Sequence, residues 1–507
     1  MKNQFLLYCF FLCLLGACAD GEQKDTPPEK PNIVFIFTDD QTYSSVAALG
    51  NSTVQTPNMD RLVQNGTTFT HAYNMGGWNG AVCVASRSMI MSGRSVWRAN
   101  QFKQNWAKRD STALAQTWGK LMERQGYDTY MMGKWHINAP AERVFQQVKH
   151  TLPGMPRDRW NHQEMQRMFK EEVDGVNVKY EDIMPIGYNR PKDENDNTWS
   201  PSDTTHGGFW KNGKHWSEIL RDDALGYIET AKTKDNPFFM YLSFNAPHDP
   251  RQAPQEYVDM YPLDKISLPK SWQPEYPDQL DIGNGPTLRD EALAPFPRTE
   301  YATKKHIQEY YAIITHLDAQ IGMILDALEA SGKMENTVVI FTADHGLAIG
   351  AHGLLGKQNL YDHSIRVPLV IMGKDIPKGK KVDTDIYLQD AMATSLELAG
   401  IKKPDYMEFH SLVNLIEGKT DEGNYPGIYG AYRNLQRMIR KDGFKLIVYP
   451  TIRKIKLFDL ENDPDEIENL AEQETYQSKV KLLMQDLLAL QKEMDDPLDL
   501  TFMLEKI

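Results

Sequence analysis

The chain has 507 residues, of which 41% are hydrophobic and 25% are charged, a composition that excludes a disordered or low-complexity protein. Single hydrophobic cores stop growing at about 250–300 residues, so a large domain with a smaller second unit is expected. The formal net charge of -13 argues against nucleic acid as a partner, because phosphate binding requires a cationic surface.

The N-terminus has the build of a secretory signal. Lys2 precedes an apolar run over residues 5–17, which is shorter than the roughly 20 residues of a membrane-spanning helix. The run ends in the sequence LGAC, which resembles the lipobox of bacterial lipoproteins and predicts cleavage before Cys18 with acylation of its sulfur. The alternative is an ordinary signal peptide in which Cys18 occurs by chance.

These features predict a signal peptide at 1–17, a polar, lipidated tether at 18–30, and an exported protein in the periplasm or at the cell surface. The lipid on Cys18 would be its only link to the membrane. Because three of the four cysteines lie in the first eighteen residues, the acylated protein keeps Cys83 as its single free cysteine. A lone cysteine in an oxidising compartment is either buried and inert or reactive.

Beyond the tether, short apolar segments alternate with amphipathic ones. The predicted strands are 32–37, 129–132, 238–244, 337–342 and 367–372. The predicted helices are 57–64, 114–124, 219–232, 307–328 and 385–398. This alternation is typical of an α/β fold, and it predicts a large, mainly parallel sheet between two layers of helices. We assign it to a catalytic domain at 31–400.

After residue 401 the alternation stops. Strands within 432–449 and at 455–460, followed by a helix at 476–492, predict a smaller C-terminal α+β unit at 401–507 with a short antiparallel sheet. Two stretches inside the larger domain, 145–215 and 249–300, are rich in Pro, Asn, Asp and Gly and show no steady period. Long insertions of this kind usually form the walls of a site.

Ligands bind at the carboxyl ends of strands in open α/β sheets, so residues that follow the predicted strands are the candidates for chemistry. Asp39 and Asp40 follow the first strand, and Asp344 and His345 follow the fourth. Adjacent carboxylates repel each other unless a cation lies between them, and hard oxygen ligands suit Ca²⁺ or, less well, Mg²⁺. The alternative for each pair is that it caps a helix.

Cys83 is followed by Arg87 and by a run, 88–91, that is compatible with a helix. A helix N-terminus carries partial positive charge and free N–H donors, and an arginine beside it matches tetrahedral anions. This segment therefore predicts a nucleophile next to an anion site, and a buried, inert cysteine is the alternative.

Four more basic residues lie near predicted strand ends: Lys134, His136, His248 and Lys357. A single lysine or histidine is usually solvated or buried in a core. So many beside strand ends, in an acidic protein, predict an anionic substrate that is held next to a metal ion.

These segments resemble, in order, the motifs of the formylglycine-dependent sulfatases of the alkaline phosphatase superfamily. The motifs are PNIVFIFTDD, TPNMDRL, CVASR, GKWH, NAPH, TADHG, GLLGK and the closing FDLENDPDEIENLA. The resemblance covers nearly the whole chain from residue 31, and it implies an alkaline phosphatase-like fold and a bacterial carbohydrate sulfatase lipoprotein. It also implies that a maturase oxidises Cys83 to formylglycine. Its hydrate, a geminal diol, attacks the sulfate ester, and the resulting sulfated hemiacetal then expels sulfate.

The same resemblance implies roles for the other candidates. Calcium would be bound by Asp39, Asp40, Asp344, His345 and the formylglycine oxygen at position 83. Arg87 and Lys134 would hold the formylglycine, and His136 would assist collapse of the hemiacetal. His248 and Lys357 would bind the sulfate, and one of them would protonate the leaving oxygen.

The chain departs from the family pattern at two positions. Ala85 stands where proline is most common, a form similar to that used with oxygen-independent radical maturation. His345 stands where many members have asparagine, a form that resembles the branch that includes iduronate sulfatases.

The substrate expected from this resemblance is a sulfated carbohydrate from glycosaminoglycans, mucin glycans or algal polysaccharides, cleaved by an exo-acting enzyme. Trp78, Asn79, Asp249 and Arg251 flank the motifs and are predicted to contact the sugar; the alternative is that Trp78 serves packing and that Asp249 and Arg251 form a local ion pair. Other functions that the motifs leave open are a phosphomonoester or phosphonate ester hydrolase, a choline or aryl sulfatase, and a glycan-binding protein without turnover.

Overall fold

The computed structural model describes residues 29–156, 161–174, 176–188 and 190–506. Their largest element is a nine-stranded sheet in which β10 is antiparallel to its neighbours and the other pairs are parallel. Eight strands run in the order β11-β2-β10-β9-β1-β8-β4-β5, and β12 also pairs with β2. The bounds are β1 Asn32–Thr38, β2 Gly66–Tyr73, β4 Asp128–Lys134, β5 Gln147–Leu152, β8 Phe238–Ser243, β9 Thr337–Ala343, β10 Arg366–Met372, β11 Lys380–Val382 and β12 Ile386–Tyr387.

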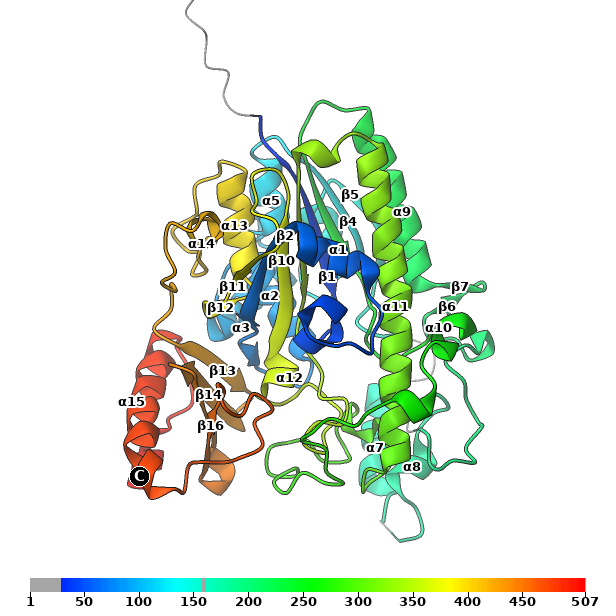
Figure 1. Cartoon of the computed structure of the whole chain (residues 1–507), viewed down its shortest axis with the longest axis vertical. Coiled ribbons are helices and arrows are strands. Elements are labelled where there is room, and N and C mark those ends of the chain that lie inside the picture. The colour runs from blue at the N-terminus through cyan, green and yellow to red at the C-terminus, as the bar shows by residue number, and fades with distance from the viewer. Residues whose placement is uncertain (1–28, 157–160, 175, 189, 507) are drawn as a thin grey trace, which may run out of the picture.

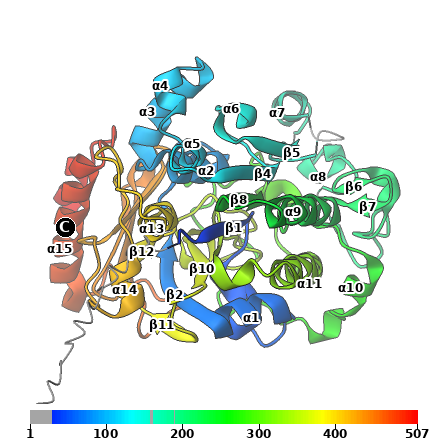
Figure 2. The same cartoon turned by 90° about the horizontal axis from the view of Figure 1, so that it is seen from above.

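Helices cover both faces of this sheet (Figures 1 and 2). Val34 and Ile36 of β1 pack in one buried cluster with α1 (Pro57–Asn65), α9 (Trp216–Lys232) and α11 (Glu300–Ala330). Alternate residues of the same strand, Phe35 among them, pack in a second cluster with α2 (Val82–Ser92), α5 (Trp118–Glu123) and α13 (Asp390–Leu398). Because both faces of the strands are buried, their sequences are continuously apolar rather than alternating.

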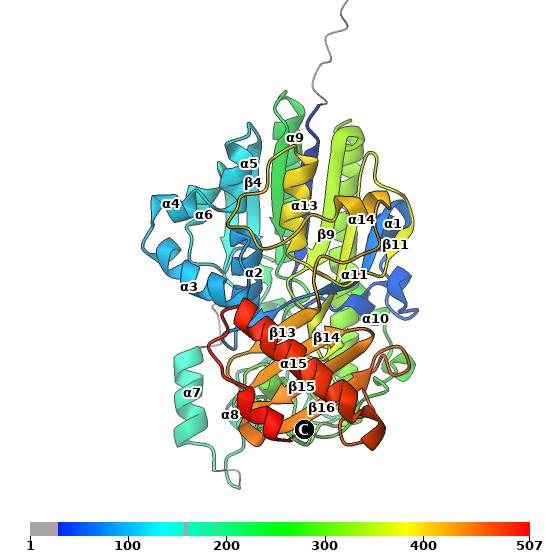
Figure 3. The ribbon, with the colours of Figure 1, turned by 90° about the vertical axis from the view of Figure 1, so that its left-hand side faces the viewer.

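A smaller five-stranded sheet lies below the large one (Figure 3). Its C-terminal strands are antiparallel: β13 Ile428–Tyr432, β14 Gln436–Lys441, β15 Phe444–Tyr449 and β16 Lys454–Asp459. Helix α15 (Gln477–Glu493) packs across one face through Val480, Leu483 and Leu487. The fifth strand, β3 (Gly76–Gly77), belongs to the segment before Cys83 and pairs with β13, so this sheet is built onto the segment that leads to the cysteine.

Shorter elements complete the described chain. They are α3 Val96–Ala107, α4 Ser111–Leu114, α6 Ala141–Val144, α7 His162–Glu171, α8 Tyr180–Ile183, β6 Trp210–Lys211, β7 Lys214–His215, α10 Gln255–Asp259, α12 Asp362–Ile365 and α14 Val413–Glu417. The insertions predicted as walls are only partly irregular: the stretch 145–215 begins with β5, the edge strand of the large sheet, and the two insertions also contain α7, α8, α10, β6, β7 and short 3-10 helices. Among the residues that the structure describes, no helix is both long and apolar enough to span a bilayer.

The α/β fold class, with a mainly parallel sheet and a separate small antiparallel sheet, is confirmed. Three predicted helices differ in their bounds. The helix predicted at 114–124 begins only at Trp118, after a turn that follows α4. The helix predicted at 307–328 extends over Glu300–Ala330. The helix predicted at 385–398 begins only at Asp390, because Ile386 and Tyr387 pair with β2. The domain boundary at residue 400 remains a prediction. The predicted signal peptide and most of the tether lie outside the described residues.

Candidate functional site

The strand ends predicted to carry the chemistry meet at one edge of the sheet. Strands β9, β1, β8 and β4 are neighbours and run parallel, so their carboxyl ends lie side by side. The backbone N–H of Asp344 donates to the carbonyl of Thr38 at 3.1 Å, and the N–H of Asp40 donates to Oδ1 of Asp344 at 3.2 Å. The two acidic motifs, about 300 residues apart in the chain, are therefore in direct contact.

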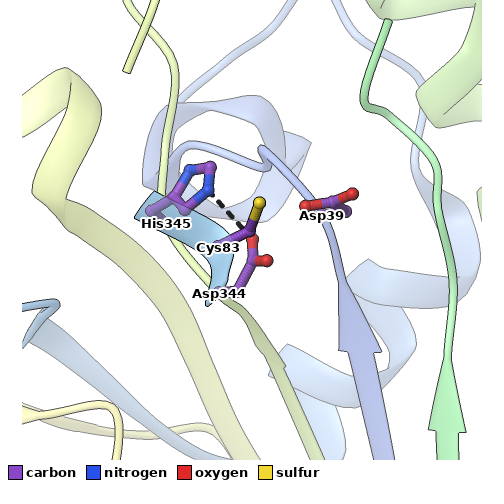
Figure 4. A group of neighbouring side chains, drawn as sticks. All are labelled: Asp39, Cys83, Asp344 and His345. Carbon is purple, nitrogen blue, oxygen red and sulfur yellow. Dashed lines mark ion pairs between the residues drawn. The ribbon is translucent and has the colours of Figure 1, made fainter. Parts of the chain in front are cut away.

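Figure 4 shows Asp39, Cys83, Asp344 and His345 gathered around one space. One ligand atom from each lies within 4.8 Å of the others, and all four side chains are buried. Asp39, Asp40 and His248 form a second, overlapping group of the same kind. None of the three carboxylates caps a helix in the described chain, so the capping alternative is not what the structure shows.

The orientation of His345 fits a metal ligand. Its Nδ1 lies 2.9 Å from the carbonyl oxygen of Gly346, so Nδ1 carries the proton and donates it. The lone pair of Nε2 then faces Asp40 Oδ1 at 3.2 Å and Asp344 Oδ1 at 3.6 Å, without a hydrogen bond. Such a contact is favourable only when a cation, either a proton on Nε2 or a metal ion, lies between the ring and the two carboxylate oxygens, and a metal ion there would have all three groups as ligands. Buried Asp39 Oδ1, which also lacks a hydrogen bond, supports the same conclusion.

Three buried cations surround the carboxylates. Lys134 contacts Asp39, the Nε of Arg87 lies 3.0 Å from Asp344 Oδ2, and Lys357 Nζ lies 2.8 Å from Asp40 Oδ1. Even so, burial raises the pKa of Asp40 well above its usual value, although Lys357 opposes the rise. Asp344 differs from Asp40, because His345, Arg87 and Lys134 hold its pKa well below the usual value despite burial. A divalent cation would favour the ionised form of Asp40 as well.

Cys83 is the second residue of α2, so it lies in the first turn of an eleven-residue helix and is 2% exposed. Its Sγ lies 3.4 Å from Nδ1 of His136. Burial, with Lys134 and Arg87 nearby, lowers the pKa of His136 to about 3, so this imidazole is neutral at pH 7 and can accept a proton. His136 also lines a pocket of about 730 Å³ together with Val84 and Trp216.

Replacing Gly154 with alanine is expected to displace His136 and to lower kcat about 100-fold, the usual scale of a lost acid–base group. A Cβ at this position would lie 2.4 Å from Cε1 of the imidazole, and the backbone of Gly154 is not in the left-handed region. Steady-state kinetics and the melting temperature would be measured on both Gly154→Ala and Gly226→Ala. In the control, the new methyl meets only the flexible Lys149 amine, so kcat should hold. An unchanged kcat for Gly154→Ala would argue against a role for His136 where it stands.

The four residues predicted to contact the sugar fall into two groups. Trp78 and Asn79 each have a buried polar atom without a hydrogen bond, whereas Asp249 and Arg251 each have a partner. Trp78 Nε1 and Asn79 Oδ1 are buried without a hydrogen bond, and the Trp78 ring lies 4.7 Å from Lys103 Nζ. The alternative of an ion pair between Asp249 and Arg251 is wrong: Asp249 pairs with Arg289, whereas Nη1 of Arg251 lies 3.0 Å from His306 Nδ1.

Sequence reasoning missed Arg289 and Asp290. They lie in the aperiodic stretch 249–300, where no strand end or motif distinguishes them. Asp290 is nonetheless buried beside Lys357, and Arg289, whose side chain is 12% exposed, contacts Asp249 and Asp290.

Comparison with known proteins agrees with this geometry. Residues 31–401 match the family model described as Sulfatase, and residues 350–493 match that of the N-sulphoglucosamine sulphohydrolase C-terminal region. A sulfatase of Formosa agariphila is 28% identical over 95% of this chain and 91% of its own, and an N-acetylglucosamine-6-O-sulfatase of Bacteroides thetaiotaomicron is 24% identical over 95% and 89%.

Two solved structures share the fold. A protein in complex with its substrate D-glucosamine-2-N,6-O-disulfate superposes with a TM-score of 0.68 at 22% identity, covering 92% of this chain and 99% of that one. A phosphonate monoester hydrolase from Silicibacter pomeroyi also gives 0.68, at 18% identity, over 92% and 96%. With the match across residues 31–401, the chain belongs to the sulfatase family and is a sulfuric ester hydrolase.

Proposed function

We propose that the protein is an exo-acting carbohydrate sulfatase that uses a formylglycine made from Cys83 and a calcium ion. The observation that carries this proposal is the convergence of Asp39, Asp344 and His345 on Cys83 within a buried space. Relatives named for glycan substrates, an N-acetylglucosamine-6-O-sulfatase and an ulvan-active sulfatase, support the carbohydrate class.

The residues present fit a calcium ion. Asp39, Asp40, Asp344 and His345 would bind it together with the oxygen of the modified residue 83, and a predominantly oxygen ligand set suits Ca²⁺ better than a transition metal. When bound, the ion supplies Lewis acidity to the sulfate ester and orients the nucleophile. Arg87 and Lys134, which contact Asp344 and Asp39, hold these carboxylates in place around it.

Oxidation of Cys83 by a maturase would supply an aldehyde whose hydrate attacks sulfur, a chemistry that a thiol lacks because it would leave a stable sulfur adduct. Arg87 and Lys134 would stabilise negative charge at this residue. His136, neutral and 3.4 Å from the position 83 side chain, would accept the proton whose loss releases sulfate.

His248 and Lys357 both lie next to the Asp40 carboxylate and would bind the sulfate oxygens. The Nε2 of His248 is 3.8 Å from Asp40 Oδ2, and Lys357 Nζ is 2.9 Å from the same oxygen. Burial and the nearby Lys357 lower the pKa of His248 well below its usual value, so His248 can donate a proton only once a substrate brings its own negative charge, whereas Lys357 already carries one. A sugar alkoxide needs such a proton because it is a poor leaving group.

The proposal is tested by sulfate release from a panel of sulfated mono- and oligosaccharides, with choline sulfate and an aryl sulfate included. Release of sulfate from at least one sugar at a higher kcat/KM than from choline sulfate or the aryl ester is expected. The reverse order would replace the carbohydrate proposal with a small-molecule sulfatase.

A second candidate is a phosphonate or phosphate monoester hydrolase, because a tetrahedral oxyanion fits the same cations and a phosphonate monoester hydrolase shares the fold. Paired aryl sulfate, phosphate and phosphonate esters with the same leaving group separate the two candidates. A higher kcat/KM for the sulfate is expected. A glycan-binding protein without turnover is less favoured, because all the predicted strand-end residues are in place.

We further propose that the protein is exported and anchored by a lipid on Cys18, which would place it where polymeric glycans are degraded. Mass spectrometry of the N-terminal peptide from the native host, before and after globomycin-type inhibition of lipoprotein processing, tests this. An unlipidated N-terminus beyond Cys18 would instead indicate an ordinary signal peptide.

A further inference from the structure

Six side chains form a closed ring that shares Asp40 with the acidic centre, by which we mean the carboxylates of Asp39, Asp40 and Asp344. In order they are Asp40, Lys357, Asp290, Arg289, Asp249 and His248. The longest steps are 3.8 Å, from Lys357 Nζ to Asp290 Oδ2 and from His248 Nε2 back to Asp40 Oδ2. Up to the histidine, the charges alternate between acidic and basic around the ring.

Arg289 closes this ring opposite Asp40. Its Nη1 contacts Asp249 and its Nη2 contacts Asp290, so the two arms of the guanidinium hold two different carboxylates. Both carboxylates are nearly inaccessible, and only 12% of the Arg289 side chain is exposed. Burial alone would raise the pKa of Asp249 and Asp290, but Arg289 and Lys357, with Arg251 for Asp249, together lower both below their usual values.

Each carboxylate contacts one of the two residues that are proposed to bind the sulfate. Asp249 fixes His248: Nδ1 of the imidazole donates to the Asp249 backbone carbonyl at 2.7 Å and lies 3.3 Å from its Oδ1, so Nε2 is left to face Asp40. Asp290 lies beside Lys357 and also accepts a hydrogen bond of 2.6 Å from Gln358, the next residue along the chain.

We propose that Arg289 is a positioning residue that holds His248 and Lys357 together as one proton-donating and sulfate-binding pair. This inference rests on the proposed function. It assigns Arg289 no contact with the sugar, because both of its terminal nitrogens are already paired with carboxylates. Asp249, which the sequence predicts to contact the sugar, is instead assigned the role of holding His248 in place.

The proposal makes the effect of Arg289 depend on the leaving group. A sugar alkoxide is strongly basic and needs a donated proton to leave, whereas a nitrophenolate leaves readily without one. If Arg289 acts through His248 and Lys357, its loss lowers turnover of sugar sulfates much more than turnover of activated aryl sulfates. A general structural defect would lower both equally.

The test compares kcat on a sulfated sugar and on 4-nitrophenyl sulfate for wild type, Arg289→Gln, Arg289→Lys, Asp249→Asn and Asp290→Asn. The matched control is Arg437→Gln, which breaks a more deeply buried arginine–aspartate pair, between β14 and Asp496, in which the side chains are 1% and 0% exposed. We expect Arg289→Gln to lower kcat about 100-fold on the sugar sulfate and about 3-fold on the aryl sulfate. The Arg289→Lys variant can hold only one carboxylate, so its kcat on the sugar sulfate should lie between those of wild type and Arg289→Gln. Asp249→Asn should show the same bias.

Equal losses on both substrates, or a loss only in KM for the sugar, would overturn the positioning role, and the second result would make Arg289 a sugar contact. Should Arg289→Gln fail to fold, the Arg289→Lys and Asp249→Asn variants carry the same comparison. If the wild type prefers phosphate or phosphonate esters, the proposed function fails. The role of Arg289 is then still tested by comparing an alkyl ester with a nitrophenyl ester of the preferred phosphate or phosphonate.

Discussion

Changing Cys83 to alanine is expected to lower sulfate release by about 10⁴-fold or more while the protein stays folded, because the variant has no side chain that can become a nucleophile. The substitution removes only a sulfur atom from the first turn of α2. Alanine has the highest helix propensity, and a cavity of this size costs about 1 kcal/mol. The activity loss should therefore far exceed any change in the melting temperature.

The matched control is Ser88→Ala in the same helix. Ser88 is 1% exposed and its Oγ is buried without a hydrogen bond, so its removal changes a similar small, buried group outside the acidic centre. Ser88→Ala should keep near wild-type kcat. Near-normal turnover by Cys83→Ala would instead remove Cys83 from the mechanism.

Mass spectrometry separates the nucleophile from its modification. The peptide that contains Cys83 from active wild-type protein should weigh about 18 Da less than expected for cysteine, as oxidation to the aldehyde requires. Active protein whose peptide carries an intact thiol would contradict formylglycine while leaving the site itself in place.

The parts of the fold that the sequence predicts are those with a local signal. Strands β1, β8 and β9 are continuous apolar runs that end in polar motifs, which identifies a buried parallel sheet and its functional edge. Strand β2 gave no such signal. It contains Thr67 and Thr68, which are buried although polar, and its place between β10 and β11 depends on segments more than 290 residues further along the chain.

In the candidate site, too, only the residues with a local sequence signal could be predicted. Residues at strand ends, such as Asp39 and Asp344, were predicted to converge because parallel strands align their ends. Arg289 was not, because the loop that carries it has no period, and its contacts depend on how that loop folds back over His248. For the same reason, adjacency in sequence suggested a pair between Asp249 and Arg251, while the folded chain gives each a different partner.

Removing the metal is expected to abolish turnover and to lower the melting temperature, and Ca²⁺ should restore both. Without a cation, Asp39, Asp40 and Asp344 repel one another in a buried space, and the lone pair of His345 Nε2 faces carboxylate oxygens. An ion that binds only the folded state stabilises it by about 2.7 kcal/mol at one hundred times its dissociation constant. Activity, metal content and thermal unfolding would be measured after chelation and after adding back Ca²⁺ or Mg²⁺.

Asp344→Asn should lose bound metal and at least about 10³-fold in turnover, because Asp344 contacts Arg87, His345 and the backbone of Asp40 as well as facing the ion. Asp318→Asn is the matched control. Asp318 is 1% exposed, against 0% for Asp344, and it likewise accepts backbone N–H bonds, from Asn58 and Met59, but it lies on α11 outside the acidic centre. Its substitution should lower stability without changing metal content. Full activity in chelated protein would refute the metal site. If Mg²⁺ restored activity better than Ca²⁺, the site would stand but its ion would be Mg²⁺, which demands a smaller, octahedral shell.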